Sequence, residues 1–259
     1  MRGKTLILLA IAALAGFSLQ AKAGIMLGTA GDFAVLAGST VTNTGSSVVK
    51  GGHVGVSPGS AITGLPPGIV VPPFKMHAAH AVASHAKNDL TTAYNAAAAL
   101  SPTLDLTGTD LGNLTLTPGV YFFSSSAELT GTLTLDAQSD PNAQFVFQIG
   151  STLTTASDSS VVTINCGSMA GCGCNVFWQV GTSATLGTRT AFEGHILAQE
   201  SITLVTGATI LGSALARTGA VTLDSNSITN CVIPEPATMT LALLGGAMLL
   251  IRRSHRGGR

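Results

Sequence analysis

Charged residues are scarce in this sequence. Only 9% of its 259 residues are Asp, Glu, Lys or Arg, whereas ordinary globular domains have about 25%. Seven of the twelve Lys and Arg residues lie in the terminal segments 1–23 and 233–259. The basic residues between those segments are Lys50, Lys75, Lys87, Arg189 and Arg217. So small a basic footprint excludes nucleic acid as a partner.

The sequence also has few groups that could carry catalysis. Polysaccharide lyases and hydrolases, which also occur on β-helices, need carboxylates or basic groups gathered on one face. Residues 147–228, which contain the repeats described below, offer only Asp158, Glu193, Glu200 and Asp224 as acids. Glu193 and His195 alternate on an expected strand, but no nucleophile or third orienting group accompanies them. We therefore predict that the protein is not an enzyme.

Three histidines lie close together in an alanine-rich segment, at positions 77, 80 and 85. On a helix, His85 would point well away from His80 at 3.6 residues per turn, which leaves two neighbours, too few for a strong metal site. Solvent-facing histidines are the preferred interpretation. We expect neither a metal nor a cofactor.

The N-terminus has the form of a secretory signal peptide. Arg2 and Lys4 precede an apolar run from Leu6 to Phe17, and Ala21-Lys22-Ala23 follows as a small-x-small cleavage site. We therefore expect a signal peptide over residues 1–23 and a mature protein that begins near Gly24.

The C-terminus combines Pro234-Glu235-Pro236, an apolar stretch over 237–251 and a group of arginines. This pattern resembles the PEP-CTERM sorting signal of Gram-negative bacteria. The apolar stretch is shorter than the ~20 residues of a lasting transmembrane helix, and the arginines favour retention on the cytoplasmic side. The resemblance implies a transient inner-membrane anchor, cleavage by a sorting protease near Pro234–Pro236 and release to the cell surface. A permanent C-terminal anchor is the alternative.

Cysteine is rare as well. The four cysteines are Cys166, Cys172, Cys174 and Cys231, and an even number in an exported protein favours disulfides over zinc ligation. Cys172 and Cys174 would close a very tight ring with each other, so we expect each of them to pair with Cys166 or Cys231. Two connectivities remain open.

The most informative feature is an internal repeat. Residues 176–192 align with residues 194–210 at a shift of eighteen, and residues 212–228 continue the series with one position of slippage. Apolar residues alternate with threonines within each repeat, which places the aliphatic side chains inward and Thr185, Thr203 and Thr222 outward. A fixed period near twenty predicts a β-solenoid.

One segment breaks this pattern. Residues 74–100 are rich in alanine, contain no Gly or Pro, and lie between Pro72-Pro73 and Ser101-Pro102. Mostly small residues recur every three to four positions, which predicts a single helix over about 74–100 with a narrow apolar stripe. The expected stripe consists of Met76, Ala79, Ala83, Ala86, Leu90, Ala93, Ala97 and Leu100.

Several stretches resemble one family. They are GDFAVLAGSTVTNTG (31–45), PGVYFF (118–123), FVFQIGSTL (145–153) and the whole of 191–229. These stretches are similar to the microbial ice-binding-protein-like domain. The resemblance implies a mainly β fold, a discontinuous parallel β-helix of triangular cross-section with one long α-helix along a face. It also implies that distant parts of the chain interleave as rungs.

On this basis we divide the chain into three parts: a signal peptide at 1–23, an ice-binding-like solenoid domain at 24–232 with its helix at about 74–100, and a sorting and transmembrane segment at 233–259. The resemblance implies an exported protein, secreted or at the surface of a Gram-negative cell. It would adsorb to an ice crystal through a flat face rich in Thr and Ser, and inhibit ice growth or recrystallisation. The alternative is a surface or biofilm-matrix protein that binds exopolysaccharide.

Two arrays of residues are candidates for the binding face. A motif found in some active members, Thr, then Ala or Gly, any residue, then Thr or Asn, is complete at 206–209. Its equivalents one repeat earlier and later complete the first array: Thr188, Thr190, Thr206, Thr209, Ser225 and Ser227. The second array is the outward column Thr42, Thr154, Thr185, Thr203 and Thr222, with Thr40, Thr152, Ser183 and Ser201 beside it. Because threonine is favoured on any exposed strand, the sequence does not choose between the arrays.

Overall fold

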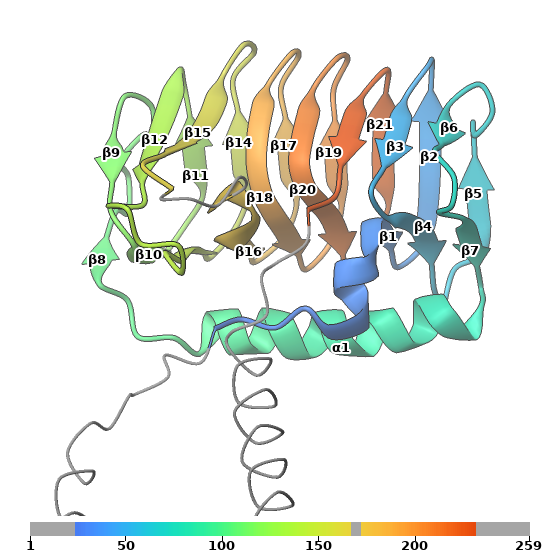
Figure 1. The fold of residues 1–259 in the computed structure, drawn as a ribbon, viewed down its shortest axis with the longest axis horizontal. Coiled ribbons are helices and arrows are strands. Elements are labelled where there is room, and N and C mark those ends of the chain that lie inside the picture. Colours follow the sequence, from blue (N-terminus) through green and yellow to red (C-terminus); the bar gives the residue numbers. More distant parts are fainter. Residues whose placement is uncertain (1–23, 167–171, 232–259) are drawn as a thin grey trace, which may run out of the picture.

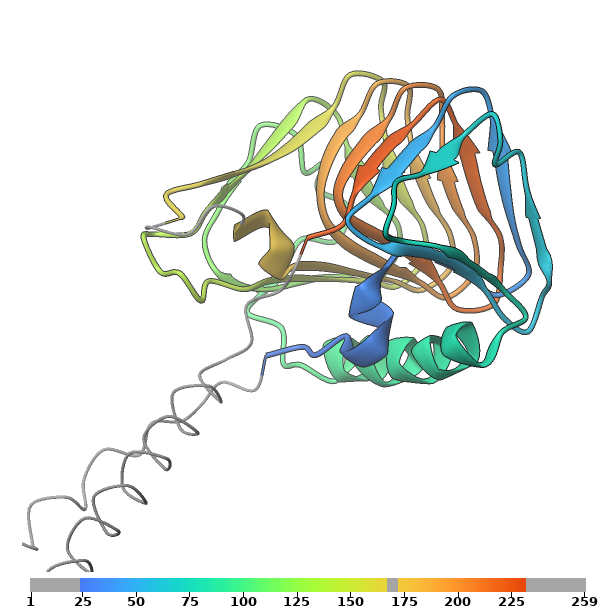
Figure 2. The same ribbon diagram turned by 45° about the vertical axis from the view of Figure 1, so that its right-hand side comes forward.

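The described chain is a triangular solenoid of parallel strands. The computed structural model describes residues 24–166 and 172–231, and it confirms the expected discontinuous parallel β-helix with one helix along a face (Figures 1 and 2). Each coil contributes strands to three faces, which we call the helix face, the seven-strand face and the third face. Within the described residues no helix combines the length and the apolar character that crossing a membrane requires.

The helix face lies against α1 (Ala81–Ala98). In spatial order its strands are β8 (Leu104–Asp105), β10 (Gly119–Phe123), β13 (Phe145–Ile149), β16 (Val176–Val180), the second halves of β18 (Ala191–Ala198) and β20 (Thr209–Ala216), β1 (Phe33–Ala37), β4 (His53–Val56) and β7 (Met76–Ala78). The 3-10 helix η1 (Gly28–Asp32) precedes β1, and η2 (Cys172–Asn175) precedes β16.

The seven-strand face is a separate, unbranched sheet. Its strands are β11 (Ala127–Leu129), β14 (Leu153–Thr155), β17 (Ala184–Leu186), β19 (Ile202–Leu204), β21 (Val221–Asp224), β2 (Thr40–Thr44) and β5 (Ala61–Thr63). The third face contains β9 (Thr115–Leu116), β12 (Thr132–Asp136), β15 (Ser160–Ile164), the first halves of β18 and β20, β22 (Ser227–Thr229), β3 (Val48–Lys50) and β6 (Ile69–Val70).

The order of coils in space differs from their order in the chain. The first coil pairs with the last, because β1 lies beside β20, β2 beside β21, and β3 beside β22. Along the chain, β1–β7 form one end of the solenoid, and α1 then runs back along its length to the opposite end. The later coils, from β8 onward, extend from there until β20–β22 lie beside β1–β3 (Figure 1). This interleaving is what the family resemblance implied.

The repeat register predicted from the sequence is confirmed strand by strand. Val180, Ala198 and Ala216 are aligned neighbours, and so are Phe192, Ile210 and Ile228. The aliphatic residues of β17, β19 and β21 are all at most 1% exposed. Alternation with a period of two therefore identified the inside and the outside of these coils correctly.

Stacked side chains fill the solenoid interior. An aromatic column runs through Tyr121, Phe147, Trp178 and Phe192, with successive ring centroids 5.3, 3.9 and 4.9 Å apart. The Trp178 indole N–H is satisfied by the backbone carbonyl of Glu193 at 3.1 Å. Because the coils stack on one another, each large ring contacts a ring of a neighbouring coil. These contacts bury apolar surface along the axis of the solenoid.

The helix is shorter than predicted. The sequence indicated a helix over about 74–100, but α1 begins at Ala81 and ends at Ala98. Residues 76–78 instead form β7, which pairs with β4. Ala79 then takes a positive φ of 51°, and His80 caps the helix by accepting a hydrogen bond from the Val82 N–H. Pairing with β7 provides hydrogen-bond partners for the backbone N–H and C=O groups along the edge of β4. A helix that began at residue 74 would have left these groups unpaired.

The alanine stripe packs α1 closely onto the sheet. Ala83, Ala86, Leu90, Ala93 and Ala97 are at most 1% exposed, and they contact apolar residues on the outer side of the helix face. Small side chains allow this close approach of helix and sheet. The residues that the sequence assigned to the buried stripe in the centre of the helix are therefore confirmed.

Polar contacts fix the helix at several points. Near its C-terminal end the Gln148 side-chain amide donates to the carbonyls of Ala97 and Leu100, both at 2.8 Å. In its middle Lys87 Nζ donates to the carbonyls of Ala216 and Arg217. Burial lowers the pKa of Lys87 to about 7, and the nearby Arg217 charge contributes to the same shift.

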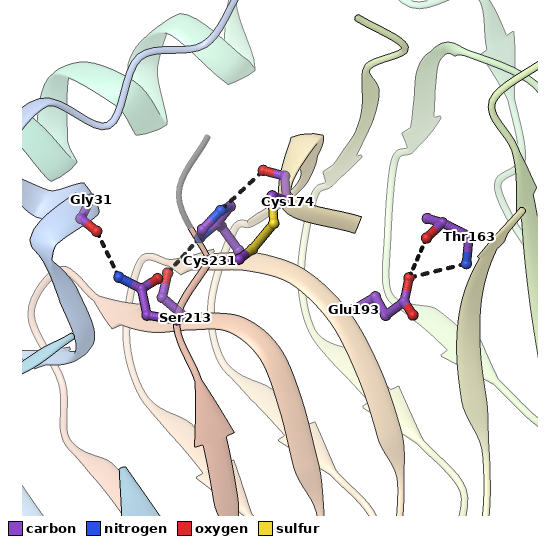
Figure 3. The surroundings of a disulfide bond; sticks show 8 residues. Gly31, Thr163, Cys174, Glu193, Ser213 and Cys231 are labelled. Carbon is purple, nitrogen blue, oxygen red and sulfur yellow. Dashed lines mark hydrogen bonds between the residues drawn. A yellow bond between two sulfur atoms is a disulfide. The ribbon is translucent and has the colours of Figure 1, made fainter. Parts of the chain in front are cut away.

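One disulfide is described in full. Cys174 and Cys231 are bonded, with Cα atoms 5.6 Å apart (Figure 3), which agrees with one of the two expected pairings for Cys174. Cys166 is disulfide-bonded too. The side chain of Cys172, the signal peptide and the sorting motif Pro234–Pro236 lie outside what the structure describes.

Candidate functional site

A column of threonines runs across six of the seven strands of the seven-strand face, and the exposed Glu128 occupies the equivalent position on β11 at its end. The register of the sheet places Thr154, Thr185, Thr203, Thr222, Thr42 and Thr63 side by side on six consecutive parallel strands. They point outward, because the residues that precede them in the strands point inward. Five of these preceding residues are buried at 0–1% exposure, and Ile62, which precedes Thr63, is partly buried against the core. Neighbouring strands lie about 4.8 Å apart, so the hydroxyl and methyl groups repeat at that interval.

A second column lies two residues earlier on the same strands. It consists of Ser126, Thr152, Ser183, Ser201, Ala220, Thr40 and Ala61. Thr152 donates to Ser126 at 2.8 Å, and Thr42 donates to Thr222 at 3.3 Å in the first column. These contacts between adjacent coils hold hydroxyl groups in fixed positions. The second predicted array therefore forms a two-column grid of small polar and apolar groups.

The seven-strand face is the best suited of the three to a large flat ligand. The helix face is covered by α1. On the third face one outward column reads Glu193, Leu211, Thr229 and Lys50, a mixture of charged, apolar and polar groups. The seven-strand face combines regular pairing along all its strands with the lack of a covering element among the described residues (Figure 2).

The first predicted array is divided by the corner between two faces. Thr188, Thr206 and Asp224 stand at equivalent positions at the end of the seven-strand face. Thr206 donates to the Asp224 carboxylate. Thr209 and Ser227, in contrast, begin strands on the third face. These residues therefore do not form one surface.

Thr190 contradicts its predicted role. It is 0% exposed, and its hydroxyl bonds Thr155 Oγ1 at 2.7 Å and the Ala156 carbonyl at 3.2 Å. The equivalent residues in neighbouring coils, Ala208 and Asn226, are buried as well. The third position of the corner turn points into the solenoid. The Thr190 hydroxyl therefore forms hydrogen bonds inside the corner and cannot contact an external ligand.

Ser225 and Arg189 occupy the exposed tip of this corner. Both have positive φ, at 53° and 55°, as does the equivalent Gly207 at 73°. Arg189 forms a two-pronged ion pair with Asp158, at 2.7 and 2.6 Å. Hydrogen bonding from Arg189 lowers the pKa of Asp158. Arg189 and Asp224 are the charged residues that interrupt the sequence motif. Arg189 pairs with Asp158, and Asp224 accepts a hydrogen bond from Thr206, so both charges are held at the edge of the face.

The strand pair of Glu193 and His195 does not form an acid–base site. Glu193 accepts from Thr163 N at 3.0 Å and from Thr163 Oγ1 at 2.6 Å, and it lines a groove of about 320 Å³ on the third face (Figure 3). His195 is 0% exposed, and its ring nitrogens contact Ser213 Oγ and the Cys174 carbonyl. Each side chain is thus held by structural contacts of its own.

Of the three clustered histidines, His80 and His85 are exposed, as expected, whereas His77 is half-buried on β7. His77 Nε2 lies 3.3 Å from His53 Nδ1, which accepts a hydrogen bond from Lys75 N. Burial lowers the pKa of His77, and the neighbouring His53, His80 and Lys75 lower it further. Among the residues that the structure describes, no three His, Cys, Asp or Glu side chains are grouped so that they could hold a metal ion.

Sequence reasoning missed Thr63 at the end of the first column. Its strand adds to β2, and the period of eighteen applies only to the later coils. The signal was present, because Ile62-Thr63 repeats the inward–outward pair Val41-Thr42. The missing information was that these two strands are neighbours.

Comparison with known proteins gives consistent results. The family model described as Ice-binding-like matches residues 35–229. An ice-binding protein of Nostoc sp. (strain HG1) is 55% identical over 98% of this chain and 95% of its own length. The crystal structure of an ice-binding protein from the Antarctic ascomycete Antarctomyces psychrotrophicus superposes with a TM-score of 0.75 and 41% identity, over 81% of this chain and all of that one. An ice-binding protein from an Antarctic biological consortium gives the same TM-score at 47% identity, over 80% of this chain and 90% of that one. These similar proteins carry the names of ice-binding proteins and not of enzymes.

Proposed function

The chain belongs to the ice-binding-like family, and from this premise we propose that it adsorbs to ice through the seven-strand face and inhibits ice growth or recrystallisation. The observation that carries the choice of face is the unbroken column of six threonines on consecutive strands. The first array contributes through its members at the edge of this face, Thr188 and Thr206. Thr209, Ser225 and Ser227 stand at its corner or beyond it.

The chemistry of the grid suits a crystalline water surface. Each threonine presents a methyl group, which leaves little room for disordered hydration, beside a hydroxyl that can hold an ordered water. The stacked backbone fixes these groups about 4.8 Å apart between strands and about 6.6 Å apart along a strand, and such spacings are close to repeats in ice. Because the sheet is rigid, little conformational entropy is lost when the face adsorbs.

Adsorption depends on the number of contacts rather than on the strength of one. A single water-mediated contact is weak, but contacts that are linked in one rigid array act together as a multivalent ligand. An adsorbed protein then curves the advancing ice front between neighbouring molecules and stops its growth. Charged groups would retain their own hydration shells, so we place the binding surface on the six strands that carry threonine, with Arg189 and Asp158 at the corner and Glu128 on the terminal strand outside it.

For the route to the cell exterior, we propose that residues 1–23 are a signal peptide, that 24–232 is the exported domain, and that 233–259 is a PEP-CTERM sorting segment with its motif at Pro234, Glu235 and Pro236. A sorting protease of a Gram-negative inner membrane would remove that segment. Intact mass spectrometry of the exported protein distinguishes this route from permanent anchoring, because cleavage leaves a C-terminus near residue 234. The four cysteines, with one bond fully described, suit an oxidising compartment.

Three double substitutions test which surface binds ice. Thr185→Tyr with Thr203→Tyr places bulk in the centre of the seven-strand face, Thr188→Tyr with Thr206→Tyr places it at the corner, and Thr132→Tyr with Thr229→Tyr places it on the third face. We expect the first pair to abolish recrystallisation inhibition, the second to weaken it, and the third to leave it unchanged. Activity is measured with purified 24–231 at micromolar concentration.

Two outcomes contradict the proposal. If the third-face pair abolishes activity while the central pair does not, the face is wrong. If unsubstituted protein neither shapes ice crystals nor slows recrystallisation, ice is not the ligand. Binding of that inactive protein to isolated exopolysaccharide would then support the matrix role.

A further inference from the structure

The two ends of the solenoid carry opposite charge. At one end, residues 46–80 form the coils of β3–β7 and contain Lys50 and Lys75 but no Asp or Glu. At the other end, residues 101–143 form the coils of β8–β12 and contain five acids but no Lys, Arg or His. We call these segments the basic end and the acidic end, and Figure 1 places them on opposite sides of the molecule.

The charged side chains at both ends are accessible. Lys50 and Lys75 are exposed at the basic end, and Asp105, Asp110 and Glu128 are exposed at the acidic end. None of these five takes part in an ion pair among the described residues. Each end therefore presents uncompensated charge to solvent.

Two carboxylates of the acidic end, Asp105 and Asp110, are stabilised in their ionised form by hydrogen bonds. Hydrogen bonds from the Thr107 hydroxyl and N–H lower the pKa of Asp105. For Asp110, desolvation raises the pKa, but hydrogen bonds from the backbone of Gly112 and from Thr130 outweigh it, and the pKa is lowered overall. The negative charges of Asp105 and Asp110 are therefore maintained at physiological pH.

The helix dipole adds to this asymmetry. α1 begins directly after β7 at the basic end and leads to β8 at the acidic end (Figure 1). A helix carries about half a positive charge at its N-terminus and half a negative charge at its C-terminus. Both features therefore give the solenoid axis the same polarity.

Each end also exposes unpaired strand edges. β5, β6 and β7 are the last strands of the three faces at the basic end, and β11, β9 and β8 are the last at the acidic end. All neighbouring strands are parallel, so copies stacked with their axes in the same direction would place β7 beside β8, β5 beside β11 and β6 beside β9 as parallel pairs. Unpaired edges are templates for such addition.

Exposed apolar side chains accompany these edges. Ile69 and Met76 on the basic end are 51% and 49% exposed, and Leu104 on the acidic end is 48% exposed. The prolines near the basic end, at positions 58, 66, 67, 72 and 73, all lie outside β5–β7, so these strands keep their backbone N–H donors. Contact between copies could bury apolar area as well as pair charges.

We propose that the basic end of one copy docks against the acidic end of another, so that the protein associates head to tail along the solenoid axis. The partner is a second copy of this chain because charge, helix dipole and strand direction at one end are each complementary to those at the other. The edge strands are only two or three residues long, so the association is weak and depends on electrostatics. It is independent of ice, and it can fail without affecting the proposed function.

Sedimentation velocity at two salt concentrations tests this proposal. The protein is the chain from Gly24 to Cys231, which contains every strand of the solenoid. At about 0.01 M ionic strength, where the Debye length is about 30 Å, we expect dimers and longer species. At about 1 M, where it is about 3 Å, we expect monomers. A monomer under both conditions overturns the proposal.

A charge variant and a matched control locate the contact. Lys50→Gln with Lys75→Gln removes two positive charges from the basic end and should leave a monomer at low salt. Ser157→Glu with Ser225→Asp changes the net charge by the same amount at exposed positions away from both ends, and should still associate. Equal behaviour of the two variants would contradict end-to-end docking.

Cross-linking gives an independent readout. A carbodiimide joins a lysine amine to a carboxylate with loss of water only when the two groups touch. At low salt, mass spectrometry should identify links from Lys50 or Lys75 to Asp105, Asp110 or Glu128. Links confined to the middle of the solenoid would show a lateral contact instead and overturn the head-to-tail arrangement.

Discussion

His195 is a buried imidazole held without a charged partner. Its ring stacks on Phe177 at a centroid distance of 5.6 Å and contacts Ser213 and the Cys174 carbonyl. Burial lowers its pKa from 6.5 to about 4, and the Cys174 contact opposes this only in part. The side chain is therefore neutral in the folded protein at pH 5, where the unfolded chain would protonate it.

This difference predicts a loss of stability in acid. Between pH 6.5 and 4 the unfolded state binds a proton that the folded state does not, so the free energy of unfolding falls as pH falls through that window. The pKa difference corresponds to about 3 kcal/mol at most. His195→Gln removes this titration and should flatten the pH dependence, whatever it costs at pH 7.

Urea denaturation at pH 7 and at pH 4.5 measures the effect, with His85→Gln as the control because His85 is exposed on α1. The acid-induced loss should be smaller in His195→Gln than in the unsubstituted protein and unchanged in His85→Gln. An equal loss in all three proteins would show that other groups dominate the acid sensitivity.

At the scale of residues, the sequence predicted the inward or outward direction of side chains correctly on strands but not in the corner turns. Alternation identified Thr185, Thr203 and Thr222 as outward, and the register confirms it. The family motif, in contrast, placed Thr190 on the surface, because a motif of residue types does not show that the third position of this corner turn points inward. Strands have a fixed period of two, whereas corner geometry depends on φ values that only coordinates give.

At the scale of elements, two glycines allow long strands to bend. β18 and β20 each pass from the third face to the helix face, and Gly194 and Gly212 are paired at the bend with φ of 112° and 139°. A Cβ on Gly212 would lie 2.0 Å from the Gly194 carbonyl oxygen. We therefore expect Gly212→Ala to destabilise the protein by more than about 4 kcal/mol, as for the most damaging substitutions.

Gly207→Ala is the matched control. This glycine also has a positive φ, 73°, but the nearest atom to an added Cβ is Arg189 Cγ at 3.5 Å, an ordinary contact. Its cost should be limited to the left-handed backbone, about 1–2 kcal/mol. Chemical denaturation of both variants distinguishes steric overlap from backbone strain, and equal losses would mean that the strands separate to admit the methyl group.

The helix shows why element boundaries exceed what local sequence can specify. Composition predicted the alanine stripe, and the stripe residues from Ala83 to Ala97 are buried as expected. The first residues of the predicted helix, however, form β7 against β4. Local propensity in residues 74–80 favours a helix, but the open edge of β4 supplies backbone hydrogen bonds that override it.

At the scale of the whole molecule, the period of eighteen predicted the architecture but not the order of its coils. Repeats align only with neighbours that resemble them, so the series 176–228 was visible in the sequence. The family resemblance implied that distant coils interleave, but the position of β1–β3 beside β20–β22 came from the structure. No local signal indicates that Thr42 and Thr222, 180 residues apart in the sequence, are adjacent.

This long-range closure predicts a late folding step. Thr42 and Thr222 are 180 residues apart, whereas Ser183 and Ser201 in adjacent later coils are 18 apart. Closing the tenfold longer loop costs about 2 kcal/mol more conformational entropy, so the first coil should join about thirtyfold more slowly. Pulse-labelled hydrogen exchange during refolding checks this: the Val48 amide, which donates to the Asn226 carbonyl, should gain protection after the Ala184 amide, which donates to Ser201. Simultaneous protection of the two amides would show that the first coil closes in the same step as the later coils, and would contradict the prediction.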